Sequence, residues 1–208
     1  MNKIDKIIEY LNELYPNPRC ELNYNKDYEL LIAVVLSAQT TDKRVNQVTP
    51  ILFSKYPSLK DLKEADIEEL YAILRPIGMY RKKALFVNEI ASTLHDEYKG
   101  RVINDRKVLE NLSGVGRKSA NVVMAELFKG PYIAVDTHVS RVSKRLGLVS
   151  ENDNVLQIEK KLTKLIDESL LPKIHHQLVL FGRCHCKAIK PNCDNCKLRS
   201  ICNYKKEE

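Results

Sequence analysis

Hydrophobic and polar positions alternate with the period of an α-helix along most of the chain. The two clearest series are Ile4, Ile7, Ile8, Leu11 and Leu14, and Ala84, Val87, Ala91, Leu94 and Tyr98. Apolar residues at this spacing line one face of a helix, so both segments are predicted to be amphipathic helices. The segment 28–38, YELLIAVVLSA, is apolar on every face and contains no turn residue, which predicts a buried central helix.

Helix start and stop signals divide the chain into short elements. Asp66 followed by Glu69 has the pattern of a capping box, and Asp105 precedes the apolar positions of a further helix. Proline and glycine occur between the periodic segments at helix-length intervals. The sequence has no Asn-Gly or Asp-Gly pair between alternating runs, so a substantial sheet is not expected. Together these signals predict an all-α fold.

The composition is that of a folded protein, because 44% of the residues are hydrophobic and 29% are charged. No apolar run approaches the roughly 18 residues that a membrane span requires. The N-terminus opens a charged amphipathic pattern rather than a secretory signal. We therefore expect a cytoplasmic protein with no membrane partner.

The net charge favours a polyanionic partner, because 34 basic side chains against 27 acidic ones leave +7. The basic residues gather near the C-terminus, where Asp194 is the one acid between residues 183 and 206. They are Arg183, Lys187, Lys190, Lys197, Arg199, Lys205 and Lys206. This segment is predicted to form a basic patch.

The segment 112–124, LSGVGRKSANVVM, sets two glycines between two helical patterns. Gly114 and Gly116 allow a tight turn and a close approach of the backbone to a ligand, and the free amides of the following helix favour an anion. On spacing alone, a plain turn between helices is slightly favoured over a helix-hairpin-helix that binds phosphate. Arg117 and Lys118, directly after the turn, narrow the gap between these two interpretations.

The C-terminal cysteines have the spacing of a metal site. Cys186, Cys193, Cys196 and Cys202 follow the pattern C-x6-C-x2-C-x5-C. A chain of this length without an export signal keeps its thiols reduced, which argues against disulfides. Four thiolates suit either tetrahedral zinc or a 4Fe-4S cluster, and the spacing leaves both open. Cys20 and Cys184 lie outside the pattern and are expected to be free or buried thiols.

Several of these motifs together resemble the endonuclease III family of DNA glycosylases. The resemblance rests on LSGVGRKSANVV, on IAVDTHVSRV at 133–142 and on the cysteine spacing, and LLIAVVLSAQTTD and PIGMYRKKA occur in the family's order. It implies a two-lobed helix-hairpin-helix glycosylase fold with a C-terminal iron-sulfur cluster loop at 186–202. The implied central helical domain is 22–132, and the implied second lobe joins 1–21 to 133–208.

The resemblance implies a bifunctional DNA N-glycosylase and AP lyase of base excision repair. Its expected partner is duplex DNA with oxidised or damaged pyrimidines or with abasic sites, cleaved 3′ to the abasic site by β-elimination, and it is expected to act as a monomer near the nucleoid. The alternatives are a monofunctional mismatch glycosylase and a non-catalytic, metal-stapled DNA-binding module. The family spacing favours a 4Fe-4S cluster over zinc on the four cysteines.

Two residues acquire catalytic roles only through the resemblance. On the sequence alone Lys118 is a solvated, phosphate-facing side chain, and Asp136 is the N-cap of a helix. The resemblance implies that the Lys118 amine attacks the sugar C1′ and forms a Schiff base. It implies that Asp136 stabilises the oxocarbenium-like sugar and assists proton movements.

The resemblance also implies a set of DNA contacts. Gln39 is expected to insert toward the orphaned partner base, and Met79 to act as the apolar wedge where the family often has leucine. The remaining expected contacts are to phosphates: Arg81 with Lys82 and Lys83 after the wedge, Gly114, Gly116 and Arg117 in the hairpin, and Lys187 and Lys190 in the cluster loop.

Overall fold

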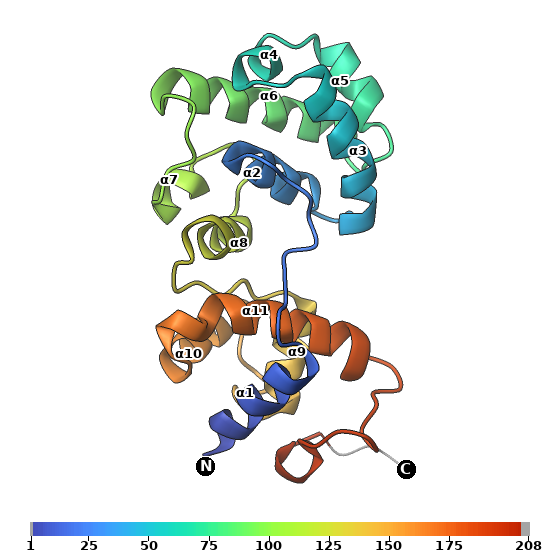
Figure 1. Ribbon diagram of the computed structural model, residues 1–208, viewed down its shortest axis with the longest axis vertical. Coiled ribbons are helices and arrows are strands. Elements are labelled where there is room, and N and C mark those ends of the chain that lie inside the picture. Colours follow the sequence, from blue (N-terminus) through green and yellow to red (C-terminus); the bar gives the residue numbers. More distant parts are fainter. Residues whose placement is uncertain (1, 205–208) are drawn as a thin grey trace. The chain divides into compact units, whose positions relative to one another are not determined.

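The computed structural model describes residues 2–204 as helices joined by turns and loops, and no β-strand occurs in this range. The all-α prediction is therefore confirmed. Contacts divide the chain into two compact units, residues 20–128 and residues 1–19 with 129–208 (Figure 1). Within the described range, no helix has the combination of length and apolar character needed to traverse a lipid bilayer.

The middle unit, residues 20–128, is built around one buried helix. Its elements are α2 (Asp27–Leu36), α3 (Asp42–Lys55), α4 (Leu59–Lys63), α5 (Ile67–Leu74), α6 (Tyr80–Glu97), α7 (Arg106–Glu110) and α8 (Arg117–Phe128). Helix α2 is buried at every residue from Tyr28 to Leu36 and packs against α3, α6 and α8. This confirms the buried helix that the apolar run predicts, and it makes α2 the support for the loop that follows it.

The predicted helix starts are confirmed at Asp66 and Asp105, whose carboxylates accept hydrogen bonds from the first backbone amides of α5 and α7. The predicted capping box is wrong for Glu69, the second of its two residues. Glu69 accepts from the Tyr56 hydroxyl at 2.6 Å and pairs with Lys55 at 2.9 Å instead of returning to the Asp66 backbone. A hydroxyl and an ammonium group from α3 and its C-cap thus replace the local backbone donor.

The second unit contains both the first and the last helical segments of the chain. Its elements are α1 (Lys3–Leu14), α9 (Thr137–Arg145), α10 (Val155–Leu165), η1 (Glu168–Leu170), α11 (Leu171–Leu180), the π-helical turn η2 (Phe181–His185) and η3 (Arg199–Ile201). Helix α11 packs against α1 and α9, and the turn η2 continues it.

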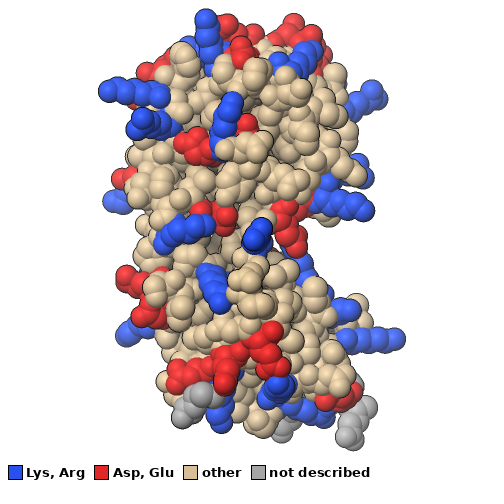
Figure 2. Space-filling view, viewed as in Figure 1, with Lys and Arg blue, Asp and Glu red and all other residues tan. Residues whose placement is uncertain are grey.

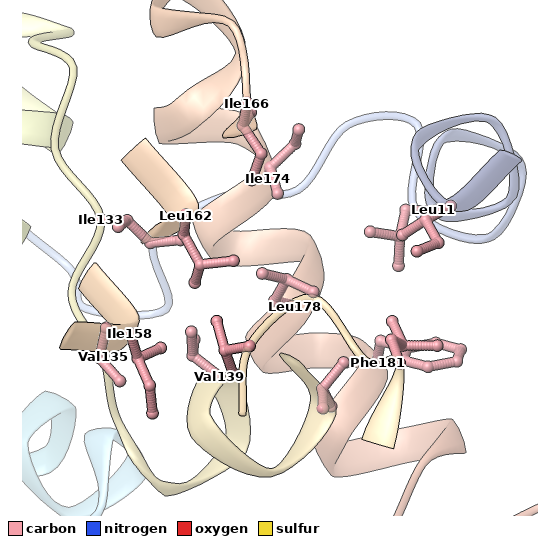
Figure 3. Packing of buried hydrophobic residues seen from close by; sticks show 14 of the residues in the cluster. Leu11, Ile133, Val135, Val139, Ile158, Leu162, Ile166, Ile174, Leu178 and Phe181 are labelled. Carbon is pink, nitrogen blue, oxygen red and sulfur yellow. The ribbon is translucent and has the colours of Figure 1, made fainter. Parts of the chain in front are cut away.

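A single apolar core holds the second unit together and fixes the start of α9. Leu11, Leu178 and Phe181 meet in this core with side chains from α9 and α10 (Figure 3). Val135 and Val139 are both buried in the same cluster. Because these two residues flank the first turn of α9, Asp136 between them has a fixed position within this unit.

Candidate active site and nucleic-acid interface

The helix-hairpin-helix that the two glycines predict is present in the middle unit. Helix α7 ends at Glu110 and α8 begins at Arg117, and the Val115 amide donates to the Leu112 carbonyl oxygen at 3.0 Å across the turn. Gly114 has φ +76°, and a Cβ added there would collide with the ring of Phe86. Only glycine therefore fits this position without strain.

The outer side of the hairpin is open within its own unit. A Cβ added at Gly116 would meet no atom within 4 Å. Helix α8 follows directly, and the first amides of a helix lack partners inside the helix and carry its positive dipole end. The turn and the first turn of α8 therefore have the form of a phosphate-binding site.

Lys118 is the second residue of α8 and is exposed. Its amine makes no ion pair or hydrogen bond with any residue in the described range 2–204. The helix that carries it is anchored by Ala120, Val123 and Met124, which are buried. The structure thus presents a free primary amine on a rigid element of the middle unit.

Asp136 is the N-cap of α9, as its position in the sequence predicts. Its Oδ1 accepts a hydrogen bond from the Val139 amide at 2.8 Å. Within residues 2–204, Oδ2 has no hydrogen-bond partner. His138 lies on the same turn beside Arg141, with 3.2 Å between its Nδ1 and Arg141 Nη2. A carboxylate held through one oxygen keeps the other for charge stabilisation or proton transfer.

The two predicted duplex-opening residues share an uncommon backbone conformation. Gln39 follows the end of α2 with φ 55°, and Met79 precedes α6 with φ 56° and is 53% exposed. Left-handed backbone is unfavourable for residues other than glycine and concentrates at functional sites. A Cβ added at Gly78 would lie 3.9 Å from both the Gln39 carbonyl oxygen and Thr40 Oγ1. The loops that carry Gln39 and Met79 therefore lie close together.

The expectation that the basic run after Met79 faces phosphates is wrong for Lys83. Arg81 and Lys82 are exposed beside the rings of Tyr80 and Phe86. Lys83, expected to face phosphates with them, is 2% exposed, and its burial lowers the pKa of its ammonium group. Its hydrogen bonds go to the loop that carries Gln39, so it is unavailable to a phosphate.

The four cysteines of the C-terminal pattern line one cavity of about 380 Å³ in the second unit. Burial raises the pKa of the Cys196 and Cys202 thiols, and the neighbouring thiol groups raise it further. No three His, Cys, Asp or Glu side chains in residues 2–204 are arranged to hold a single metal ion. The all-thiolate donor set fits either a tetrahedral metal ion or an iron-sulfur cluster.

Arg145, at the end of α9, ties down both ends of the cysteine segment. Its Nη1 donates to the Lys187 carbonyl oxygen at 2.6 Å and contacts Cys186 Sγ at 3.5 Å. Its own carbonyl oxygen accepts from Cys202 Sγ at 3.1 Å. Arg141, one turn earlier, donates to the Cys186 carbonyl oxygen at 3.2 Å. Helix α9 therefore carries Asp136 at one end and supports the cysteine cavity at the other.

Only some of the basic side chains in the predicted C-terminal patch are without an acidic partner. Lys187 and Lys190 are exposed and make no ion pair with another described residue. Arg199 pairs with Asp194 at 2.6 Å, and Lys197 pairs with Glu13 at 2.5 Å. On the face shown in Figure 2, basic and acidic side chains are interspersed. Lys205 and Lys206 lie outside the described residues.

Of the two remaining thiols, Cys184 is exposed, and burial raises the pKa of Cys20 to about 11.

Comparison with known proteins identifies the family. Residues 32–168 match the model of the HhH-GPD superfamily of base excision DNA repair proteins. Endonuclease III of Bacillus subtilis (strain 168) is 43% identical over 202 residues, which are 97% of this chain and 92% of that protein. A trapped covalent endonuclease III–DNA intermediate, an estranged-adenine complex, is 46% identical with a TM-score of 0.91 and covers 97% of this chain and 96% of its own.

A thermostable thymine-DNA glycosylase shares the fold, with a TM-score of 0.88, 24% identity, and coverage of 97% of this chain and 96% of its own. Its identity is too low to carry more than the fold. The family model covers more than half of the chain, and the Bacillus subtilis relative matches almost all of it. The chain belongs to the endonuclease III family within the HhH-GPD superfamily of base excision DNA repair proteins.

Proposed function

We propose that this protein is a bifunctional DNA N-glycosylase and AP lyase of base excision repair, acting as a monomer on duplex DNA. The observation that carries the proposal is the free amine of Lys118 at the start of α8. It occurs in a chain 46% identical to an endonuclease III that was trapped covalently on DNA. The proposed substrates are oxidised or otherwise damaged pyrimidines and abasic sites.

Lys118 is the proposed nucleophile. Its neutral amine attacks C1′ of the extruded nucleotide, the bond from C1′ to the base breaks, and the base leaves with the electron pair. The attacking nitrogen then loses a proton, and O4′ gains a proton as the C1′–O4′ bond breaks, which opens the sugar ring and gives a protonated Schiff base to the lysine nitrogen. Removal of a C2′ proton then expels the 3′ phosphate, and hydrolysis of the imine releases the cut strand and restores the amine. One residue thereby supplies both activities.

Asp136 is the proposed partner in charge stabilisation and proton transfer. A developing positive charge on the sugar is stabilised by a carboxylate that is already fixed in place. The Val139 amide nitrogen lies 2.8 Å from Oδ1 and fixes this oxygen by a hydrogen bond, whereas Oδ2 has no partner among the described residues. We expect Oδ2 to face the sugar and to exchange protons during formation of the Schiff base.

The proposed DNA contacts follow the chemistry of each element. The hairpin amides at Gly114 and Gly116, with Arg117, bind a phosphate. Arg81, Lys187 and Lys190 add phosphate contacts because they are exposed and positively charged. Gln39 and Met79 enter the duplex where the target nucleotide has left the stack.

We also propose that Cys186, Cys193, Cys196 and Cys202 hold a 4Fe-4S cluster. The donor set is all thiolate, the four side chains line a single cavity, and their spacing is the one that the family resemblance associates with a 4Fe-4S cluster. When bound, the cluster supplies a cross-link between four points of the segment and a redox-active centre. Equal iron and sulfide contents with negligible zinc support this assignment, and stoichiometric zinc would overturn it.

A substrate panel tests the function against its alternatives. The protein is incubated with duplexes that contain thymine glycol, an abasic site, a G·T mismatch or no lesion, and released bases and strand breaks are measured separately. Base release with strand cleavage at thymine glycol supports the proposal. Release only at the mismatch, without cleavage, would support a monofunctional mismatch glycosylase. Salt-sensitive binding without either product would support a DNA-binding module.

A further inference from the structure

Lys83 is the only buried lysine or arginine among the described residues. It lies in the first turn of α6 with its side chain directed inward. Its ammonium group donates three hydrogen bonds: to the Leu36 carbonyl oxygen at 2.9 Å, the Ala38 carbonyl oxygen at 2.6 Å and Thr40 Oγ1 at 3.0 Å. An ammonium group has three donors, so each of them is satisfied.

These hydrogen bonds lie on both sides of Gln39. Ala38 precedes Gln39 and Thr40 follows it, so the ammonium group holds the backbone that carries the left-handed residue. The main chain of Lys83 holds the other left-handed residue, because its amide donates to the Met79 carbonyl oxygen at 3.1 Å. One residue therefore binds the segments that carry both proposed duplex-opening side chains.

The chemistry at this position explains why the residue is charged. Leu36 is the last residue of α2, and carbonyl groups at the end of a helix carry partial negative charge. A cation is favourable there, but burial of an ammonium group is costly unless every donor is paired. Because movement of the loop between Leu36 and Thr40 would leave the buried ammonium group without acceptors, the three hydrogen bonds hold this loop in one conformation.

We propose that Lys83 is a positioning residue that holds Gln39 and Met79 together in the geometry that enters the duplex. This inference rests on the proposed function, in which those two side chains fill the space left by the extruded nucleotide. Lys83 itself does not touch DNA. Its loss is expected to impair opening of the duplex without impairing the chemistry of Lys118.

The main test replaces Lys83 with methionine in the cluster-loaded protein. Base removal from a thymine glycol duplex is compared with borohydride trapping on single-stranded abasic DNA, which needs no duplex opening. A displaced loop is expected to lower duplex activity about 10- to 100-fold and to leave single-strand trapping unchanged. A fluorescent 2-aminopurine opposite the lesion, which brightens when unstacked, is expected to lose its enzyme-induced signal. Lys60→Met, at an exposed lysine of the same unit, is the control for loss of charge.

A gentler pair of variants covers the case in which Lys83→Met does not fold. Thr40→Val removes one of the three acceptors while keeping the side-chain shape, and Thr40→Ser keeps the hydroxyl. The valine variant is expected to lose duplex activity in the same direction as Lys83→Met but to a smaller extent. The serine variant is expected to retain duplex activity.

Variants of the two inserted residues separate failure of this inference from failure of the proposed function. If Gln39→Ala and Met79→Ala leave duplex activity unchanged, the proposed insertion is wrong and the inference fails with it. If they lower duplex activity while folded Lys83→Met does not, the inference alone is overturned. An equal loss on duplex and single-stranded substrates would likewise overturn it, because that is the result of general damage.

Discussion

Replacement of Gly114 by alanine is expected to destabilise the hairpin strongly. A non-glycine residue in left-handed backbone costs about 1–2 kcal/mol, and Gly114 has φ +76°. The added Cβ would also collide with the ring of Phe86, and overpacking of this kind costs about 1–3 kcal/mol. Together these effects lower the free energy of unfolding by about 3 kcal/mol. For a domain of this size that corresponds to a fall in Tm of about 6–12 °C.

Gly116→Ala is the matched control for this prediction. A Cβ at Gly116 meets no atom within 4 Å, so its change in Tm is expected to be within about 2 °C, the size typical of surface substitutions. Thermal unfolding of the cluster-loaded variants, followed by circular dichroism, gives both values. The double variant Gly114→Ala with Phe86→Ala is expected to be less destabilised than the sum of its single variants, because the collision is absent. Equal Tm values for Gly114→Ala and Gly116→Ala would refute the reasoning.

Three further predictions follow from other described contacts. Asp136→Asn keeps an oxygen that can accept the capping hydrogen bond, so Tm is expected to change little. The rate of single-turnover base release is expected to fall about 10²- to 10³-fold. An unchanged rate would exclude the catalytic role of Asp136. Lys187→Gln and Lys190→Gln are each expected to reduce the slope of log K against log[salt] for DNA binding by about 1, measured by fluorescence anisotropy. An unaltered slope would contradict the proposed phosphate contacts. Burial, aided by the hydrogen bond to Glu126, raises the pKa of Tyr24 to about 12. The contribution of the protonated Tyr24 hydroxyl to stability is therefore complete below about pH 10 and lost as the pH rises through about 12. Ultraviolet titration of Tyr24→Phe should lack one late-titrating tyrosine, and a titration curve identical to that of the native protein would be the contrary result.

The fold was predictable from the sequence because helical periodicity is a local property. The apolar run 28–38 could be satisfied only by burial on all faces, and α2 occupies that place. The caps at Asp66, Asp105 and Asp136 are also local, since each carboxylate reaches an amide two or three residues later. Glu69 departs from its pattern because a tyrosine and a lysine that no local rule places there take its carboxylate.

The role of Lys83 was missed, although the sequence contains a signal for it. Lys83 falls on the same helical stripe as Val87, Ile90 and Leu94, all of which are buried. A basic residue on an apolar stripe is more informative than its membership in a run of charges. The acceptors of Lys83 are 43 to 47 residues away in the sequence, so their identity could not be read locally.

The support of the cysteine segment is likewise non-local. The spacing of the four cysteines predicts a shared site, but nothing in that spacing identifies Arg145, which is 41 residues before Cys186 and 57 before Cys202. The left-handed conformation shared by Gln39 and Met79 was also beyond the sequence, since neither is a residue type that favours φ > 0. Such features depend on tertiary contacts.

The measurement that tests the central claim most directly is borohydride trapping with the native protein, Lys118→Gln and the control Lys60→Gln. Each is incubated with duplexes that contain thymine glycol, an abasic site or no lesion. The account predicts a covalent protein–DNA adduct on both damaged duplexes with the native and control proteins, and no adduct with Lys118→Gln. The absence of an adduct with cluster-loaded, DNA-binding native protein, or a full adduct with Lys118→Gln, would contradict it.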